Sequence, residues 1–268
     1  MKVVLFCGGL GLRMREESAR LPKPMIPLGD RPILWHIMKY YSDFGIRDFV
    51  LCLGYRAEVF KEYFLNYSEA LSNDFVLTGG GKTVELLSSD THDWSMTFVN
   101  TGLHSTIGER LKHVEPHLEG DEIFLATYGD GLTNAPLGDM VDLLVSSGKT
   151  AAFLCVHPTY QFHVVSLDGG NGVREIRDVG AADLWINGGY FVFRREIFDY
   201  LHPGEDLVDD AFNRLIAEDK LLAYPYEGFW APMDTLKDKQ TLESLLESGD
   251  PPWSRPRGLD VPDSSSSG

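Results

Sequence analysis

The sequence predicts an α/β fold built on a central, mostly parallel β-sheet flanked by helices. Short apolar runs rich in β-branched and aromatic residues alternate with longer segments whose apolar residues recur at helical spacing. The first such run, residues 2–7, leads directly into a glycine-rich turn, an order typical of parallel sheets that hold an anionic ligand at their carboxyl edge. With 268 residues, 43% of them hydrophobic, the chain can bury a sizeable core.

Each element follows from its local pattern. The first helix is expected to begin after Pro32, to present one apolar face and to end at Gly45. By the same criteria we expect strands at residues 2–7, 48–53, 94–100, 122–127, 150–156, 185–193 and 221–226. We expect helices at residues 33–44, 57–65, 105–115, 136–147, 206–218 and 235–247.

Two stretches are expected to form small β-rich additions to the sheet. Residues 66–100 are irregular and contain Thr78–Thr83, which reads T-G-G-G-K-T. We reject a P-loop there, because Val76 stands where that motif needs its first glycine and a strand, not a helix, follows. We expect a flexible turn between strands instead. Residues 164–177 are predicted to form a second hairpin.

Charge and cysteine content limit the partners and the compartment. The net charge of −16 argues against nucleic acid and anionic membranes as partners. Cys7, Cys52 and Cys155 lie in apolar runs, so we expect buried free thiols in a reducing cytoplasm. The sequence shows neither a signal peptide nor an apolar run long enough to span a membrane. We expect one cytoplasmic domain, residues 1–253, followed by a disordered low-complexity tail, residues 254–268.

The glycine-rich turn and the segment after it are predicted to bind phosphate. Gly8, Gly9 and Gly11 let the backbone approach a ligand and leave N–H groups to donate. Arg13 offers a planar fork for phosphate oxygens, and Lys23 a point charge between two prolines.

Two later strands also end in residues suited to ligands. Asp130 lies between glycines at the end of the strand at 122–127, a position from which a carboxylate can bind a hard cation, with Asp234 as the second carboxylate. Asn187 and Gly188 belong to an N-G-G sequence within a strand, where glycines suggest close approach of a ligand.

These motifs resemble a known family. G-G-x-G-x-R followed by P-K-P is similar to the signature of the sugar-1-phosphate nucleotidyltransferases. The resemblance extends to the glucose-1-phosphate cytidylyltransferase branch at Pro32–Lys39, Tyr128–Gly131, Ile186–Gly189 and Gly228–Thr235. It implies a Rossmann-like fold and a reaction in which a phosphate oxygen of the sugar 1-phosphate attacks the α-phosphorus of a nucleoside triphosphate and pyrophosphate leaves.

The resemblance also implies roles for individual residues. Asp130 and Asp234 would bind Mg²⁺, Arg13 would neutralise the pyrophosphate, and Lys23 would lie near the α-phosphate or the attacking phosphate. The nucleotide, with CTP favoured, would be bound by Gly8, Gly9, Gly11, Arg13, Lys23, Arg110 and Asp130. The sugar phosphate, glucose 1-phosphate by default, would be bound by Asn187, Gly188, Arg177 and Trp230.

Several of these assignments have alternatives. Arg110 would otherwise belong to a solvated helical face, and core packing explains Trp230 equally well.

In the family the region corresponding to residues 66–100 reaches neighbouring subunits, so a homo-oligomer is expected.

Two departures from the family pattern bear on activity. Leu12 replaces the usual threonine of the glycine loop. Asp178 stands where the family carries a lysine that binds the sugar phosphate, and Arg177 could replace that lysine only if the loop shifts by one residue. The alternatives are therefore the same chemistry on a different sugar phosphate, or a non-catalytic nucleotide-binding homologue.

Overall fold

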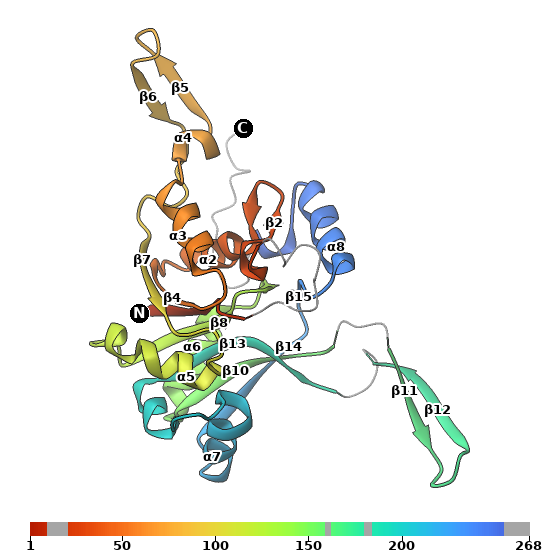
Figure 1. The fold of residues 1–268 in the computed structure, drawn as a ribbon. Coiled ribbons are helices and arrows are strands. Elements are labelled where there is room, and N and C mark those ends of the chain that lie inside the picture. Colours follow the sequence, from red (N-terminus) through yellow and green to blue (C-terminus); the bar gives the residue numbers. More distant parts are fainter. Residues whose placement is uncertain (10–20, 159–161, 180–183, 255–268) are drawn as a thin grey trace.

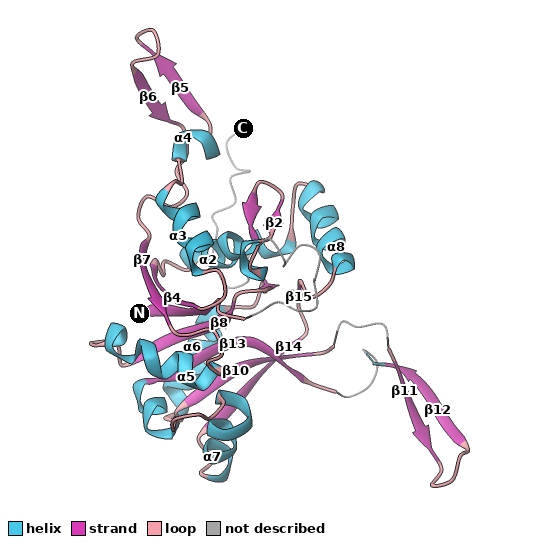
Figure 2. Ribbon diagram, viewed as in Figure 1, coloured by secondary structure: helices cyan, strands magenta, loops and turns pink. Residues whose placement is uncertain are grey.

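The computed structural model describes residues 1–9, 21–158, 162–179 and 184–254 and confirms the α/β architecture (Figures 1 and 2). Within this part of the chain, the central sheet has seven strands in the order β14-β10-β13-β8-β1-β4-β7. Their bounds are β1 (Lys2–Phe6), β4 (Asp48–Leu53), β7 (Ser95–Asn100), β8 (Ile123–Tyr128), β10 (Ala151–Val156), β13 (Ile186–Arg194) and β14 (Leu221–Tyr226). Every strand predicted for the sheet is present, with each end within one residue of the prediction.

The sheet is mixed but mostly parallel, as predicted. β1 runs parallel to both β4 and β8, β4 runs parallel to β7, and β10 runs parallel to β14. The antiparallel contacts come from β13, which lies between β8 and β10. Because β1, β4 and β8 point the same way, their carboxyl ends meet at one edge, where open α/β sheets bind ligands.

Helices cover both faces of the sheet. One face packs against α2 (Ile33–Asp43), α3 (Ala57–Leu65), α6 (Leu137–Ser147) and α8 (Leu236–Glu247), and the other against α5 (Ile107–Val114) and α7 (Phe212–Ala217). Shorter helical segments are η2 (Lys23–Met25), α4 (Glu69–Ser72), η3 (Glu115–Leu118), η5 (Arg195–Tyr200), η6 (Leu207–Ala211) and η7 (Pro252–Ser254). The helix expected at 206–218 therefore begins as a π-helical turn, in which the Ala211 N–H donates to the Asp206 carbonyl.

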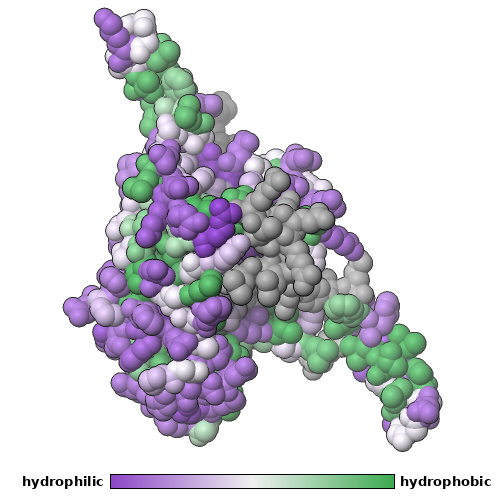
Figure 3. Space-filling model, in the orientation of Figure 1, coloured by the Kyte–Doolittle hydropathy of each residue, from purple (hydrophilic) through white to green (hydrophobic). Residues whose placement is uncertain are grey.

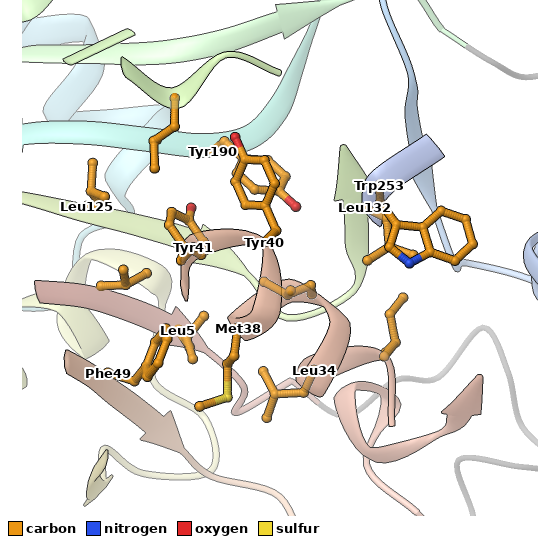
Figure 4. Close-up of a cluster of buried hydrophobic side chains, with 14 of the residues drawn as sticks. Leu5, Leu34, Met38, Tyr40, Tyr41, Phe49, Leu125, Leu132, Tyr190 and Trp253 are labelled. Atoms are coloured by element: carbon orange, nitrogen blue, oxygen red, sulfur yellow. The ribbon is translucent and has the colours of Figure 1, made fainter. Parts of the chain in front are cut away.

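Alternation along β1 divides its side chains between two cores. Val3 and Leu5 belong to the cluster beneath α2, whereas Val4 and Phe6 belong to the cluster beneath α5. All four are almost fully buried, as expected for a strand covered by helices on both faces. Figure 4 shows part of the first cluster, in which Leu5 lies close to Met38 of α2 and Phe49 of β4, and Tyr190 of β13 packs against Tyr40 and Tyr41 of α2.

Two hairpins project from the body of the molecule (Figure 1). The upper arm is β5 (Phe75–Thr78) paired with β6 (Thr83–Leu86), and the lower arm is β11 (His163–Leu167) paired with β12 (Val173–Asp178). Smaller two-stranded pairs are β2 (Pro27–Leu28) with β3 (Arg31–Pro32), and β9 (Gly131–Thr133) with β15 (Trp230–Pro232). The triple glycine at 79–81 forms the tip of the upper arm, with positive φ at all three residues, which confirms a turn between strands.

The remaining expectations on composition can be compared with the described residues. Cys7, Cys52 and Cys155 are all buried and free, as predicted. In the described part of the chain, no helix is both long and apolar enough to cross a membrane. The predicted low-complexity tail lies outside the described residues, apart from Ser254 at the end of η7.

A buried arginine holds the carboxyl edge of the sheet together. Arg110 of α5 is 3% exposed, and its Nη1 donates to the Thr101 hydroxyl and the Gly102 carbonyl, both at 2.8 Å. Its Nη2 donates to the Gly8 carbonyl at 3.2 Å. Nη1 also donates to the Leu53 carbonyl at the end of β4, at 3.5 Å. Arg110 therefore fixes the start of the glycine loop relative to the end of β4 and the loop that follows β7.

This arrangement predicts different effects of alanine at two adjacent glycines. A Cβ at Gly8 would lie 1.9 Å from Nη1 of Arg110, whereas a Cβ at Gly9 would meet no atom of the described residues within 4 Å. Gly8→Ala should therefore lower the free energy of unfolding by about 1–3 kcal/mol, because Arg110 must shift away from its carbonyl partners. Urea denaturation of both variants measures this. Gly9→Ala is the matched control, and equal stabilities of the two variants would contradict the role given to Arg110.

Candidate active site

The carboxyl edge of the sheet brings the first glycine motif beside the turn that follows β8. β1 and β8 are parallel neighbours, with Phe6 opposite Tyr128. Gly129 continues the contact, since its N–H donates to the Phe6 carbonyl at 3.3 Å. Asp130 thus lies at the end of a buried strand, next to the place where the glycine loop begins.

A short 3-10 helix, η2, carries Lys23 to the same edge. Pro24 and Met25 of this helix are buried, and they anchor the backbone that holds the lysine. A Cβ at Gly129 would lie 2.8 Å from Cγ of Pro24 and 3.3 Å from Sγ of Cys7. Glycine at position 129 is therefore what allows the lysine segment to pack directly on the strand end.

Asp234 reaches this edge from the last part of the described chain. β15 pairs with β9 in the antiparallel sense, with Pro232 opposite Gly131. The Met233 N–H then donates to the Asp130 carbonyl at 2.8 Å, which brings the residues just after β15 beside Asp130. The Asp234 N–H in turn donates to the Asp238 side chain in the first turn of α8, at 3.0 Å.

The two aspartates converge on one lysine. Nζ of Lys23 donates to Oδ2 of Asp130 at 2.7 Å and to Oδ1 of Asp234 at 2.5 Å. Burial lowers the pKa of Lys23, but the attraction of Asp130 and the hydrogen bonds that the ammonium donates to both carboxylates outweigh it, so the pKa is raised overall. The lysine is therefore a stable ammonium ion at neutral pH. The structure brings these three predicted site residues together, and their individual roles stay predictions.

The pair of carboxylates has the donor chemistry of a magnesium site. Both side chains offer an oxygen within hydrogen-bonding distance of the same point, which the Lys23 ammonium occupies. No group of three or more His, Cys, Asp or Glu side chains suited to a metal occurs among the described residues. Mg²⁺ in nucleotide-binding sites takes one or two carboxylates and completes its shell with water and substrate phosphates, so Asp130 and Asp234 fit this ion.

A pocket of about 280 Å³ opens beside the carboxylates. It is lined by Thr127, Tyr128, Asp130, Gly131, Ile186, Asn187, Gly188, Gly189, Tyr190, Trp230, Pro232 and Asp234. Nε1 of Trp230 donates to the Gly188 carbonyl at 2.8 Å, so the indole forms a fixed wall of the pocket. Of the predicted sugar-binding residues, Asn187, Gly188 and Trp230 are therefore brought together with both aspartates.

Glycine at position 189 shapes the floor of this pocket. Gly189 has φ of +77°, and a Cβ there would lie 2.4 Å from Cδ2 of Tyr128. Its N–H donates to the Asn187 side-chain oxygen at 2.8 Å. Burial, with smaller contributions from Asp206 and Asp130, raises the pKa of Tyr128 to about 12, so its hydroxyl is neutral. No sequence motif marked a role for Tyr128, directly after the strand predicted at 122–127, or for Tyr190, within the strand predicted at 185–193.

The residues at the family's lysine position lie on the lower arm. Arg177 and Asp178 belong to β12, and both are exposed. Nε of Arg177 pairs with Glu175 of the same strand at 3.1 Å. Arg177 does not line the pocket, and among the described residues the pocket wall contains no lysine or arginine. The structure thus does not bring Arg177 together with the other predicted sugar-binding residues.

Of the two interpretations of Arg110 from its sequence context, the structure excludes one. The solvated helical face is wrong, because the side chain is buried and burial lowers the pKa of its guanidinium. Its donors are directed at backbone carbonyls, including that of Gly8 at the start of the glycine loop. A direct contact of Arg110 with nucleotide phosphates stays a prediction, as do the roles of Gly11, Leu12 and Arg13, which lie outside the described residues.

Known proteins are similar to this sequence over nearly its whole length. A protein from Salmonella typhi named glucose-1-phosphate cytidylyltransferase is 39% identical over 255 residues, which are 94% of this chain and 98% of the relative. A "probable glucose-1-phosphate cytidylyltransferase" from Bacillus subtilis is 35% identical over 255 residues, which are 94% of this chain and 99% of the relative.

Solved structures share the fold at much lower identity. The apo form of a UDP-glucose pyrophosphorylase superposes with a TM-score of 0.69 at 16% identity, covering 93% of this chain and 99% of the other. A UTP-bound enzyme from Acinetobacter baumannii gives a TM-score of 0.66 at 19% identity, covering 94% and 95%. The model of the family described as nucleotidyl transferase matches residues 2–243. The chain therefore belongs to the nucleotidyl transferase family, as a sugar-1-phosphate nucleotidyltransferase similar to the glucose-1-phosphate cytidylyltransferases.

Proposed function

We propose that this protein transfers a cytidylyl group from CTP to glucose 1-phosphate, giving a CDP-sugar and pyrophosphate. The observation that carries the proposal is the convergence of Lys23, Asp130 and Asp234 at the mouth of a pocket on the carboxyl edge of the sheet. CTP and glucose 1-phosphate are chosen because two relatives that match 94% of this chain are named for that reaction.

The reaction needs positioning and charge neutralisation more than covalent help from the protein. The attacking group is a phosphate oxygen of the sugar 1-phosphate, which is already an anion and displaces pyrophosphate from the α-phosphorus. Mg²⁺ bound by Asp130 and Asp234 would supply positive charge between the two phosphate groups. Lys23 would add a second cation at the same place, and the backbone at Gly8 and Gly9 would receive the nucleotide.

The pocket supplies the sugar side of the reaction. Gly188 and Gly189 place backbone rather than side chains at its wall, which leaves room for a sugar ring close to Asn187. The indole of Trp230 is held against the Gly188 carbonyl and provides a flat apolar surface of the kind on which sugar rings pack. The sugar would thus lie within the pocket, with its phosphate directed toward Asp130, Lys23 and the bound metal ion.

A second candidate is the same chemistry on a different sugar 1-phosphate. It is favoured by the absence of any lysine or arginine from the described pocket wall and by Asp178 at the family's lysine position.

A non-catalytic nucleotide-binding protein is the third candidate. It is disfavoured because binding alone would not require two carboxylates and a lysine to converge beside a sugar-sized pocket.

We also propose that the protein forms a homo-oligomer through its two arms. The pairing register puts Phe75, Leu77, Val84 and Leu86 on one face of the upper arm. It puts Val165, Leu167, Val173 and Ile176 on one face of the lower arm. All eight side chains are between 37% and 60% exposed, and Figure 3 shows hydrophobic surface on both arms.

A second copy of the chain is the partner that fits these arms. A two-stranded hairpin with one apolar face is marginal in water unless that face is covered. Each protomer carries two such faces, so identical copies could cover one another's arms without a further protein.

Turnover with a defined pair of substrates tests the proposed function. Pyrophosphate release should be measured with Mg²⁺, crossing CTP, UTP, dTTP and ATP with a panel of sugar 1-phosphates. CTP with glucose 1-phosphate should give the highest rate, and a higher rate with another sugar would select the second candidate. Binding of a nucleotide with no release from any pair would favour the non-catalytic protein.

Replacing one of the aspartates tests the site itself. Asp130→Asn keeps the shape of the side chain but removes a charge that would bind the metal, so turnover should fall by roughly 10²-fold or more. Asp142→Asn, on the surface of α6, is the matched control and should leave turnover unchanged. Turnover of the Asp130 variant equal to that of wild type would rule out the assigned metal site.

The arm contact is tested by placing charges on its apolar face. Leu77→Asp combined with Val84→Asp should reduce the mass measured by light scattering at micromolar concentration, because two carboxylates would be buried in the contact. The pair Thr78→Asp and Thr83→Asp carries the same charges on the other face of the hairpin and should leave the mass unchanged. Equal masses for wild type and the first variant would exclude this face as the contact.

A further inference from the structure

Lys23 occupies the position at which a metal ion would bind. Its ammonium lies within 2.7 Å of Asp130 and 2.5 Å of Asp234, and the three side chains are 12%, 32% and 16% exposed. An ammonium group is a point charge with three donors, and here it neutralises two carboxylates that would otherwise repel each other. The metal-free site thus contains a cation that belongs to the protein.

A divalent cation cannot occupy the point between the two carboxylates while this ammonium occupies it. Mg²⁺ binds oxygens at about 2.0–2.1 Å in a strict octahedron, which leaves no room for a donor at hydrogen-bonding distance between them. Two cations held together in a half-buried site would also repel each other strongly. Entry of the metal therefore requires that the ammonium leave at least one of the two aspartates.

We propose that Lys23 is the resident counter-ion of the metal site and that a divalent cation displaces it from Asp130 and Asp234. This inference rests on the proposed function, because it takes the two aspartates as the metal site. The displaced ammonium is then available to a phosphate oxygen of the substrates. The lysine would thus change partners from carboxylate to phosphate as the site is loaded.

The local structure allows such a change of partner. Pro24 and Met25 are buried and hold the backbone of η2 in place, so only the lysine side chain has to move. That side chain is long and flexible, and it lies beside a pocket that opens to the carboxylates. The exchange also links two ligands, because a metal that arrives with a triphosphate gives the ammonium a new anionic partner. A free metal ion would have to displace it without that compensation.

Metal affinity without nucleotide is the first test. Binding of Mn²⁺, as a spectroscopic substitute for Mg²⁺, should be measured by electron paramagnetic resonance on wild type, Lys23→Met and Lys39→Met. Lys23→Met should bind Mn²⁺ about tenfold more tightly than wild type, because the competing cation is gone. Lys39 pairs with Asp43 on α2 and contacts neither site aspartate, so its variant should match wild type.

The opposite result would overturn the proposal. If Lys23 instead organises the carboxylates for the metal, Lys23→Met will bind Mn²⁺ as wild type does or more weakly. Asp130→Asn separates this failure from failure of the proposed function. Loss of Mn²⁺ binding in that variant keeps the metal site whatever Lys23→Met does, whereas Mn²⁺ binding that is insensitive to both variants would remove the metal site as well.

A second measurement uses only the wild-type protein and covers the case in which Lys23→Met fails to fold. Acetylation by an amine-reactive ester, followed by peptide mass spectrometry, reports how available each lysine is. Saturating Mg²⁺ without nucleotide should raise the labelling rate of Lys23 severalfold and leave that of Lys39 unchanged. An unchanged rate at Lys23, at a Mg²⁺ concentration shown to occupy the site, would overturn the proposal.

Discussion

The site depends on the contact of one ammonium with two carboxylates drawn from distant parts of the chain. The protein carries a net charge of −16, and nucleotidyl transfer brings two further anions to the same place. Without a cation between them, the two negatively charged carboxylates of Asp130 and Asp234 would repel each other. Lys23 offsets that repulsion beside the place where β9 and β15 pair and where Trp230 lies against Gly188. The contact of Lys23 with the two aspartates and the shape of the pocket therefore involve the same strand pair, β9 and β15.

Close approach of backbone segments is the second requirement, and glycines meet it where a side chain would collide. Gly129 lets Pro24, next to Lys23, lie on the end of β8, and this packing holds the lysine within reach of both aspartates. Gly8 leaves space for the Arg110 guanidinium, whose donors then satisfy carbonyls that would be unpaired at a buried loop junction. In both cases the glycine is needed for what packs beside it, and the ligand-binding role assigned to glycine loops comes in addition to that packing.

The fold was predictable because each strand carries its own apolar run, and the order of strands and helices then favours a parallel sheet. The proximity of Asp130 to the glycine loop was predictable for the same reason, since both follow strands of one sheet. The buried position of Arg110 was not predictable, because its partner Gly8 lies far away in sequence. No local sequence pattern marks a buried guanidinium that donates to backbone carbonyls. The apolar faces of the arms also needed the structure. They appear only when the register sets Leu77 opposite Val84 and Val165 opposite Ile176.

The structure also weakens the argument that Asp178, at the family's lysine position, makes against activity. Read from the sequence, Asp178 is an anion where an anionic substrate should lie, which argues against activity. In the structure it is an exposed residue of β12, opposite His163 on the lower arm, and it does not line the pocket. An exposed charge is screened by water and salt, so its repulsion of a substrate phosphate is far weaker than that of a carboxylate inside the site. The departure therefore counts chiefly as the loss of one cation. That loss places more of the burden of neutralising the phosphates on Lys23 and on the metal ion that we propose displaces it.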